Sequence, residues 1–319
     1  MGGESTNGTL VYAVVEVYSV DMSLMRVERV TVPGAVLHTE SAGDGPALLL
    51  ISGGGGDAGM YEQVVPTLAH HYTVLTYDRR GNSRSALTDP DAPIAFDVQA
   101  DDAVAVLDHY GFERAHIFGS SGGAVIGLDL LARHHERVAT LVAHEPPLVS
   151  SLPANSPEEN ELRVLVHLAR ASTLRAYAAF GAMTMTNPPA LLRSPAGQLL
   201  VAGASAVGLT FGGLVHRITG AEPGSMSRQL GNAEQVMRRE LPMIFAYQLD
   251  ETALGRLHTP WRLAVGEQSV GKPYYRPALV LAERLGVPCE VFPGGHVSYI
   301  EDPTAFTAAL QRVLGELSA

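Results

Sequence analysis

A serine stands among glycines in the stretch IFGSSGG, residues 117–123. Gly119, Ser121 and Gly123 have the spacing G-x-S-x-G, which selects Ser121 over the adjacent Ser120 as a nucleophile. In this pattern a strand turns into a helix so sharply that the central residue takes a strained backbone, and glycines two positions away avoid collisions. An apolar strand pattern precedes the stretch and a helical pattern follows it, so we interpret Ser121 as a nucleophile; a flexible bend is the alternative.

A serine hydroxyl is a weak nucleophile unless a base lies within hydrogen-bond reach, and histidine is the usual base. His296 is the best placed of the twelve histidines, because it follows the last predicted strand in FPGGHVSY. Loops at this edge of a parallel sheet carry functional residues. Gly294 and Gly295 give the backbone freedom to bring the ring over the serine. We therefore predict His296 as the base.

An acid must orient that histidine, and two glutamates end predicted strands. Glu145 lies in HEPP, after the strand that follows the serine's helix, and Glu267 ends a later strand, in AVGE. A carboxylate between an apolar strand and two prolines has a desolvation cost unless it is paired, and a catalytic histidine would be such a partner. We favour Glu145 and keep Glu267 as the alternative.

Backbone N–H groups must also stabilise the oxyanion of a tetrahedral intermediate. The residue after the nucleophile, Gly122, should supply one, and the glycine run after the strand at 47–52 should supply another. We predict Gly53, with Gly54 next. A phosphate-binding loop is disfavoured because the run has neither a Walker lysine nor a G-x-G-x-x-G opening.

Short apolar runs alternate with helical patterns on both sides of these motifs, which predicts a mainly parallel α/β sheet. The expected strands are residues 26–32, 35–41, 47–52, 72–78, 114–120, 137–147, 260–267 and 288–296. Helices are expected at 60–71, 97–111, 123–135, around 274–286, and from Pro303 to the end.

The alternation fails between residues 148 and 258, where the sequence is mostly helical with several breaks and no clear strand. We expect a helical cap (lid) over this range, inserted into a core formed by residues 25–147 and 259–319. Seven apolar side chains of the insertion could line a substrate pocket, although core packing is the commoner role for such residues: Tyr177, Phe180, Met183, Met185, Phe211, Met243 and Phe245. Residues 1–24 are interpreted as an N-terminal extension.

Composition excludes several classes of partner. The 319 residues are 46% apolar and 17% charged, with a formal net charge of −11, which disfavours attraction to nucleic acid or anionic membranes. The apolar stretch at residues 9–20 is too short to span a bilayer. The one cysteine, Cys289, precludes an internal disulfide, suits a cytoplasmic location and is expected in a buried strand.

Together these motifs resemble the α/β-hydrolase superfamily over roughly residues 30–315, with an eight-stranded, mostly parallel sheet implied. The family's acid usually lies two residues past Glu267, where this chain has Ser269. In this respect the chain resembles the zearalenone lactonase group, whose acid is a glutamate in an H-E-x-P stretch after the nucleophile helix. That stretch is His144 to Pro147 here, and the resemblance implies a triad of Ser121, His296 and Glu145.

We therefore expect a serine hydrolase that cleaves a carboxylic ester or lactone of an apolar small molecule through an acyl-enzyme. The same triad could instead serve carbon–carbon bond hydrolysis, cofactor-free perhydrolysis or a cyclisation step in secondary metabolism. A non-catalytic small-molecule binder is a further alternative. No metal or organic cofactor is expected, and the sequence leaves the substrate and the oligomeric state open.

Overall fold

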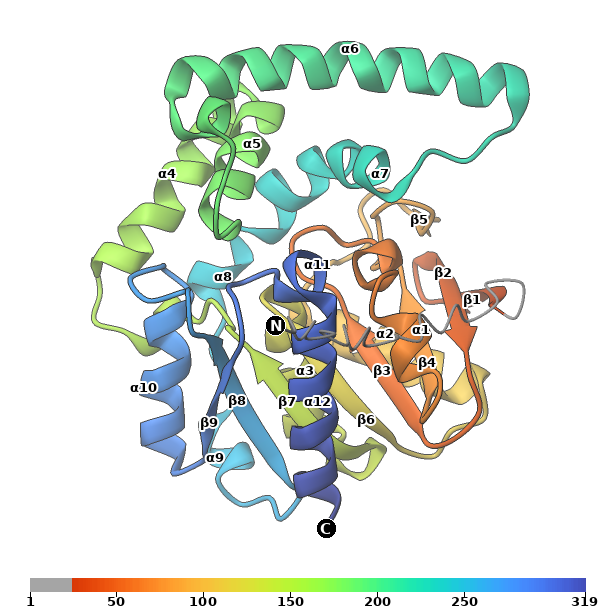
Figure 1. The fold of residues 1–319 in the computed structure, drawn as a ribbon, viewed down its shortest axis with the longest axis vertical. Helices are drawn as coiled ribbons and strands as arrows, with labels where there is room; N and C mark the ends of the chain where they lie inside the picture. Colours follow the sequence, from red (N-terminus) through yellow and green to blue (C-terminus); the bar gives the residue numbers. More distant parts are fainter. Residues whose placement is uncertain (1–24) are drawn as a thin grey trace, which may run out of the picture.

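The computed structural model describes residues 25–319, so the predicted extension at 1–24 lies outside the described residues. A mostly parallel β-sheet forms its centre (Figure 1). The strands are β1 (Arg26–Val32), β2 (Ala35–Ala42), β3 (Ala47–Ile51), β4 (Thr73–Tyr77), β5 (Ala86–Leu87), β6 (Ala115–Ser120), β7 (Val138–His144), β8 (Trp261–Gly266) and β9 (Cys289–Phe292).

The strand order is β1-β2-β4-β3-β6-β7-β8-β9, with β5 pairing to β2. The strands from β4 through β9 in this order are parallel, whereas β2 is antiparallel to β1, β4 and β5. The expected eight strands are all present. The ninth, β5, was not predicted, because two residues within a polar loop carry no readable alternation.

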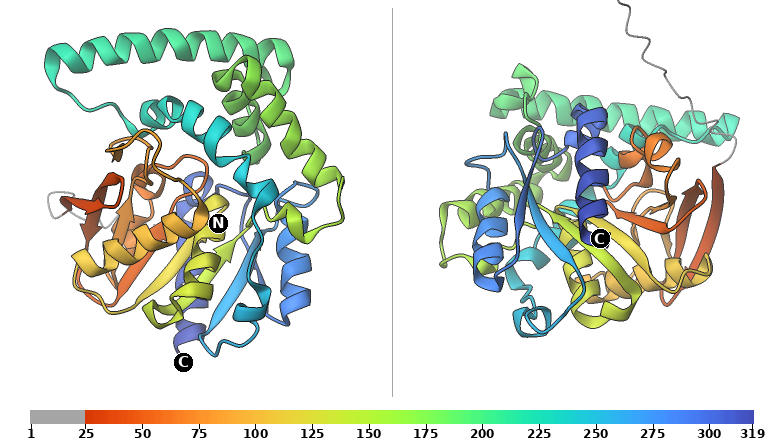
Figure 2. Two further views of the ribbon diagram at one scale, coloured as in Figure 1. Left: turned by 180° about the vertical axis from the view of Figure 1, so that it is seen from behind. Right: turned by 60° about the horizontal axis from the view of Figure 1, so that its bottom comes forward.

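Helices cover both faces of the sheet (Figures 1 and 2). The longer ones around the sheet are α2 (Phe96–His109), α3 (Gly122–Arg133), α10 (Tyr275–Leu285) and α12 (Pro303–Ser318), and the short ones are α1 (Val65–Leu68), α9 (Glu251–Leu254) and α11 (Ser298–Glu301). The helix expected at 60–71 is wrong as one piece. A 3₁₀ turn at Ala58–Tyr61 precedes α1, and Pro66 in the first turn of α1 suits a helix start because proline has no N–H to donate.

Strand alternation divides the core into two layers. In β3, Leu48 and Leu50 face the layer that contains α1 and α12, while Leu49 and Ile51 face the layer that contains α2 and α3. Both layers are fully apolar at these positions, as expected for a parallel strand that is buried on both faces. Cys289 lies in strand β9 as predicted, but it is only partly buried.

Between β7 and β8, the described chain forms helices and loops only. These include α4 (Pro157–Ala171), α5 (Thr173–Thr184), α6 (Pro195–Thr219), α7 (Ser225–Gly231), α8 (Met243–Ala246) and a π-helical segment at Gln235–Glu240. We call residues 148–258 the helical segment. In Figure 1 its helices α4 to α7 lie above the sheet, with α6 crossing the top of the molecule, whereas its last helix, α9, lies at the lower end.

Candidate active site

The turn at Ser121 has the backbone that the G-x-S-x-G spacing predicts. Strand β6 ends at Ser120, helix α3 begins at Gly122, and Ser121 between them has φ 56° and ψ −122°. A Cβ at Gly119 would collide with the carbonyl oxygen of Gly123, and one at Gly123 would collide with the backbone of β3. Glycine is therefore required at both positions, two residues on either side of the strained serine, because the backbone there leaves no room for a Cβ.

The carboxylate of Glu145 contacts both β8 and the loop that follows β9. Its Oε2 lies 2.6 Å from Nδ1 of His296, and its Oε1 accepts a hydrogen bond from the backbone N–H of Gly266 at 2.8 Å. Glu145 itself has φ 50°, a left-handed conformation that is uncommon outside glycine. Both oxygens are thus engaged, and the imidazole ring is held in one orientation.

Strand register explains why residues distant in sequence meet here. Ser120 pairs with His144 across β6 and β7, so Ser121 and Glu145 each follow a paired position, and Ser121 N–H donates to the His144 carbonyl at 2.8 Å. His296 follows β9, two strands farther along the same edge. Because these strands are parallel, their carboxyl ends lie together and bring the three side chains to one place.

Burial and hydrogen bonding act in opposite directions on the Glu145 carboxyl. Burial tends to raise its pKa, but the imidazoles of His144 and His296 and the Gly266 N–H outweigh burial, so the pKa lies below its ordinary value. The neighbouring His144 is fully buried, and burial lowers the pKa of its imidazole to about 4. Glu145 is therefore an anion beside a neutral His144 at neutral pH.

The other candidate acid is not in this arrangement. Glu267 is exposed, and its carboxylate accepts a 3.4 Å hydrogen bond from Gly294 N–H. Ser269, at the position of the usual family acid, is buried, and its N–H donates to the Gly266 carbonyl. Glu145 is thus the glutamate that contacts the histidine in the described part of the chain.

Tyr274 also contacts this histidine, a contact that the sequence did not indicate. Its ring stacks on His296 with centroids 3.7 Å apart and an angle of 27° between planes. The phenol hydroxyl donates to the backbone carbonyl of Met183 in α5 at 3.0 Å. Tyr274 therefore connects the histidine to the helical segment. No motif marks it, because the tyrosine immediately precedes an ordinary amphipathic helix, α10.

The predicted oxyanion glycines lie beside Ser121. A Cβ on Gly53 would be 2.8 Å from the Cβ of Ser121, so this part of the main chain passes directly next to the nucleophile. A buried guanidinium, Arg79, donates to the Gly53 carbonyl at 2.8 Å and pairs with Glu240 of the helical segment at 2.6 Å. The sequence analysis did not single out Arg79, because no motif marks it.

Ser121 lies between two cavities. One of about 220 Å³ is bounded by Ser121, His296, Gly53 and Gly54 together with α5. A smaller one of about 40 Å³ is bounded by Ser121, Gly54 and Gly122. All three predicted oxyanion glycines therefore border a space that adjoins the serine.

His144, Glu145 and His296 could also be read as metal ligands, since their donor atoms all lie within 4.8 Å of one another. The hydrogen bonds fit a histidine oriented by a carboxylate better. The Glu145 oxygens are used by His296 and Gly266, and Nδ1 of His296 is used by Glu145. A cation would have to displace these partners, so the donor set favours acid–base chemistry.

Comparison with known proteins identifies the family of this chain. A family model of the α/β hydrolase fold matches residues 46–186, a range that contains Ser121 and Glu145. The uncharacterised hydrolase YraK of Bacillus subtilis (strain 168) is 33% identical over 292 residues, which are 89% of this chain and 94% of YraK. The chain belongs to the α/β-hydrolase family.

Solved structures share the architecture of this α/β hydrolase. The enol-lactonase from Burkholderia xenovorans LB400 has a TM-score of 0.63 at 22% identity, covering 90% of this chain and 100% of that chain. Est816, described as an N-acyl homoserine lactone degrading enzyme, has a TM-score of 0.64 at 19% identity, and the match covers 89% of this chain and 99% of Est816. Carboxylesterase CesB (YbfK) from Bacillus subtilis has a TM-score of 0.64 at 18% identity, and the match covers 92% of this chain and 94% of CesB. At these identities the likeness shows a shared fold.

Three of the seven apolar side chains predicted as candidates for a substrate pocket line the cavity beside Ser121 in this α/β hydrolase: Tyr177, Phe180 and Met185 border the 220 Å³ space. Met183, Met243 and Phe245 instead pack partly buried against the core, and Phe211 is exposed on α6. Whether a side chain lines the cavity or packs into the core depends on which face of its helix points toward Ser121. Helical spacing alone does not reveal that face.

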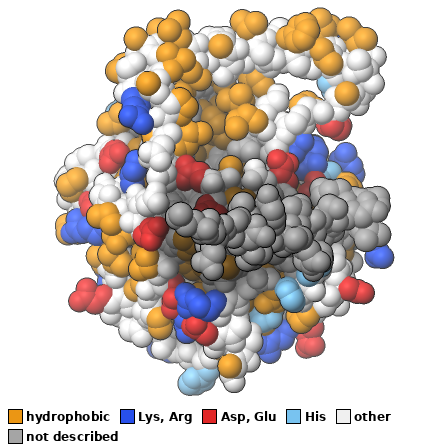
Figure 3. All heavy atoms as spheres, viewed as in Figure 1, with side chains coloured by type: hydrophobic (Ala, Val, Ile, Leu, Met, Phe, Trp, Pro, Cys, Tyr) orange, Lys and Arg blue, Asp and Glu red, His pale blue; other side chains and the backbone are white. Residues whose placement is uncertain are grey.

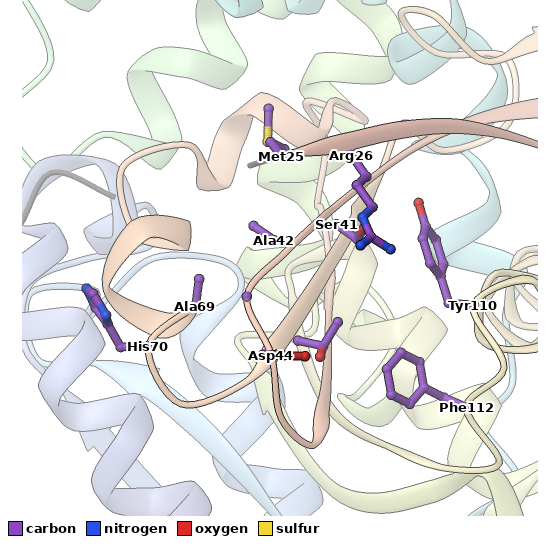
Figure 4. Close-up of a pocket in the computed structure, with 11 residues that line it drawn as sticks. Met25, Arg26, Ser41, Ala42, Asp44, Ala69, His70, Tyr110 and Phe112 are labelled. Carbon is purple, nitrogen blue, oxygen red and sulfur yellow. The ribbon is translucent and has the colours of Figure 1, made fainter. Parts of the chain in front are cut away.

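A further open pocket of the hydrolase, about 750 Å³, lies far from this chemistry (Figure 4). Its wall includes Asp44, just before β3, and Thr73, the first residue of β4, with Tyr110 and Phe112 after α2. The amino ends of β3 and β4 are at the opposite edge of the sheet from Ser121. This pocket therefore does not contribute to the site described above.

Proposed function

We propose that this protein is a serine hydrolase that cleaves a carboxylic ester or lactone of an apolar small molecule, with Ser121, His296 and Glu145 as a triad. The observation that carries the proposal is the 2.6 Å contact between Glu145 and His296 at the strand edge that also holds the strained Ser121. The glutamate in His144-Glu145-Pro146-Pro147 supports the resemblance to the zearalenone lactonase group.

In the proposed mechanism, Ser121 attacks the carbonyl carbon while His296 takes its proton through Nε2. Glu145 keeps the proton on Nδ1 of His296 and stabilises the imidazolium that forms. N–H groups of Gly122 and of Gly53 or Gly54 hold the oxyanion, and removing one such donor typically costs about 3 kcal/mol of transition-state stabilisation. His296 then protonates the leaving alcohol, and water that it activates hydrolyses the acyl-enzyme.

An apolar substrate is favoured by the cavity wall. Aromatic and methionine side chains from the helical segment, including Tyr177, Phe180 and Met185, form one side of the 220 Å³ space. The relatives with shared fold are described as a carboxylesterase, an enol-lactonase and an acyl-lactone degrading enzyme, which supports ester or lactone bonds. We further propose that residues 148–258 act as a cap on a core of residues 25–147 and 259–319, in a cytoplasmic enzyme.

A fluorophosphonate probe tests the proposal directly, because it labels only a serine activated by its base. Wild type and Ser120→Ala should be labelled, and Ser121→Ala should not. Ser120 is the matched control because it is the buried neighbour on the same turn. A panel of esters and macrolactones of graded size would then identify the substrate class. Absence of labelling in folded wild type, or equal labelling of Ser121→Ala, would rule out the hydrolase.

A further inference from the structure

Helix α6 presents an apolar surface that nothing in the described chain covers. It is 25 residues long, and its most apolar window has a mean hydropathy of 1.6 and is only 6% buried. No Asp, Glu, Lys or Arg occurs from Ser194 to His216. Figure 3 shows hydrophobic side chains along α6, which crosses the top of the molecule. A helix that is apolar around its circumference is normally buried, so α6 requires a partner.

Most of the exposed apolar side chains of α6 form one seam along the helix; Leu199 and Val215 are exposed beside it. The seam residues recur with spacings of 4, 3, 4, 3 and 4 residues, which keeps them on one face of a helix and is the heptad spacing of helix–helix packing. The seam positions are Leu200 (67% exposed), Ala204 (exposed), Val207 (70%), Phe211 (66%), Leu214 (52%) and Ile218 (74%). A seam of this kind inserts its side chains between those of another helix.

By length and composition α6 could cross a membrane, but its connections prevent this. Its first turns pack against α5, where Ala202 is buried. Its last turn leads through residues 220–224 into α7, where Arg228 pairs at 2.7 Å with Asp57 in the loop after β3. Both ends are therefore held to the same body, whereas a helix roughly 37 Å long would have to place them on opposite sides of a bilayer.

Charge disfavours a lipid surface as the partner. Helices that lie flat on membranes usually carry lysine and arginine on the face opposite the apolar one. In α6 the only such residue is Arg217, in the last turn, and the whole chain has a net charge of −11. Anionic lipids would repel this protein. An uncharged helix instead lets two acidic chains approach each other closely where they carry no charge.

We propose that two copies of this chain associate through the seam of α6. The two helices run antiparallel, and the twofold axis crosses them at the level of Leu209 along the helix. In this register, Leu200 of one copy faces Ile218 of the other, and Val207 faces Phe211. Each contact then occurs twice, as in isologous dimers. Antiparallel helices also place opposite ends of their dipoles together.

The ends of the helix and its size fit this arrangement. Exposed Arg193 precedes α6 and exposed Glu222 follows it, so the antiparallel register brings each arginine toward the other copy's glutamate. An open groove of about 790 Å³ beside Val207 and Phe211 has room for a partner's side chains. Half of the lateral surface of such a helix is roughly 600 Å², so the pair would bury roughly 1,200 Å², the lower end of stable interfaces.

Molecular mass in solution provides the first test. Sedimentation equilibrium of wild type should give twice the chain mass of 33.8 kDa. Phe211→Glu and Val207→Glu should give monomers with unchanged circular dichroism, since both side chains are exposed in one copy. Val164→Glu is the matched control, because Val164 is 55% exposed on α4 and should leave the dimer intact. A monomeric wild type would overturn the proposal.

Cysteine pairing tests the register, using Cys289→Ala to remove the one native thiol. A chain carrying both Leu200→Cys and Ile218→Cys should form disulfide-linked dimers, and neither single variant should, because equal positions lie roughly 27 Å apart in the antiparallel pair. Efficient crosslinking by each single variant would overturn the antiparallel arrangement. If wild type is monomeric and floats with phosphatidylglycerol vesicles, and if Phe211→Glu abolishes the flotation, then α6 binds a lipid surface and not a second copy.

Discussion

Glu145 and His296 are 151 residues apart in sequence, yet Oε2 of the glutamate lies 2.6 Å from Nδ1 of the histidine. The pair is almost completely excluded from solvent, with side-chain exposures of 0% and 3%. A hydrogen bond to a carboxylate in such surroundings is stronger than in water, and it fixes which ring nitrogen carries the proton. The remaining ring nitrogen is then free to act as a base.

Replacing Glu145 by an uncharged side chain of the same size should therefore abolish most of the turnover while the fold stays intact. Glu145→Gln keeps the size of the side chain but removes the negative charge that holds the His296 tautomer, so kcat for any accepted ester should fall roughly 10³- to 10⁴-fold. Glu267→Gln is the matched control. It changes an exposed glutamate that directly follows the neighbouring strand β8, and activity should remain within about twofold of wild type. The opposite ranking in steady-state kinetics would show that Glu267 is the acid.

Tyr274 should affect the rate through the histidine it stacks on. Tyr274→Leu removes the aromatic contact, which is worth about 0.5–1.5 kcal/mol, so kcat should fall roughly 2- to 10-fold with little change in KM. Tyr274→Phe keeps the ring and loses only the hydrogen bond to Met183, and its kcat should stay near that of wild type. Equal losses in both variants would indicate that the hydroxyl, not the stacking, is important.

The ion pair between Arg79 and Glu240 should contribute to stability in an asymmetric way. Both side chains are buried, so Arg79→Met leaves an uncompensated carboxylate and should lower the free energy of unfolding by about 3–5 kcal/mol. The double variant Arg79→Met/Glu240→Leu should recover part of this loss, because neither charge then remains buried. Urea unfolding of wild type, Arg79→Met, Glu240→Leu and the double variant measures the coupling.

A surface pair supplies the comparison for that experiment. Arg312 is half exposed and contacts Glu316 one helical turn away in α12. Arg312→Met should cost less than about 1 kcal/mol, because solvent screens the pair. If Arg79→Met were as mild as Arg312→Met, the buried pair would not be holding the helical segment to the Gly53 loop.

Stability should fall as the solution is acidified from neutral pH, through His144. Burial lowers its pKa in the folded protein to about 4, below the ordinary value near 6.5 that the unfolded chain retains. Between these values the unfolded state binds a proton that the folded state does not, so unfolding becomes easier as pH falls. From pH 7 to pH 5 this group alone should remove about 2 kcal/mol.

His144→Phe should flatten this dependence, since phenylalanine fills the apolar site beside Phe118 and Phe292 without titrating. The free energy of unfolding in urea at pH 7 and pH 5 provides the measurement. The lowered pKa of Glu145 acts in a different window: its contribution is present above the pKa of an unfolded glutamate, near 4.3, and is lost as pH falls below it. An unchanged slope in His144→Phe would contradict the assignment.

Much of the fold could be predicted from local pattern. Apolar runs such as residues 47–52 marked buried strands, because a strand covered on both faces has no polar alternation. The turn at Ser121 was also predictable from local pattern, since only glycine fits two residues before and two residues after the strained serine. The two-residue strand β5 and the break before α1 were not predicted, because very short elements depend on neighbours that are distant in sequence.

The sequence by itself determined the type of each candidate residue: a serine in a glycine turn, a histidine after the last strand, and two glutamates at strand ends. Only the tertiary structure decided which glutamate contacts the histidine. Strand order and the left-handed backbone of Glu145 set that distance, and neither is encoded within a few residues. The same is true of Arg79, Tyr274 and the exposed seam on α6, because burial and contact are properties of the packed chain.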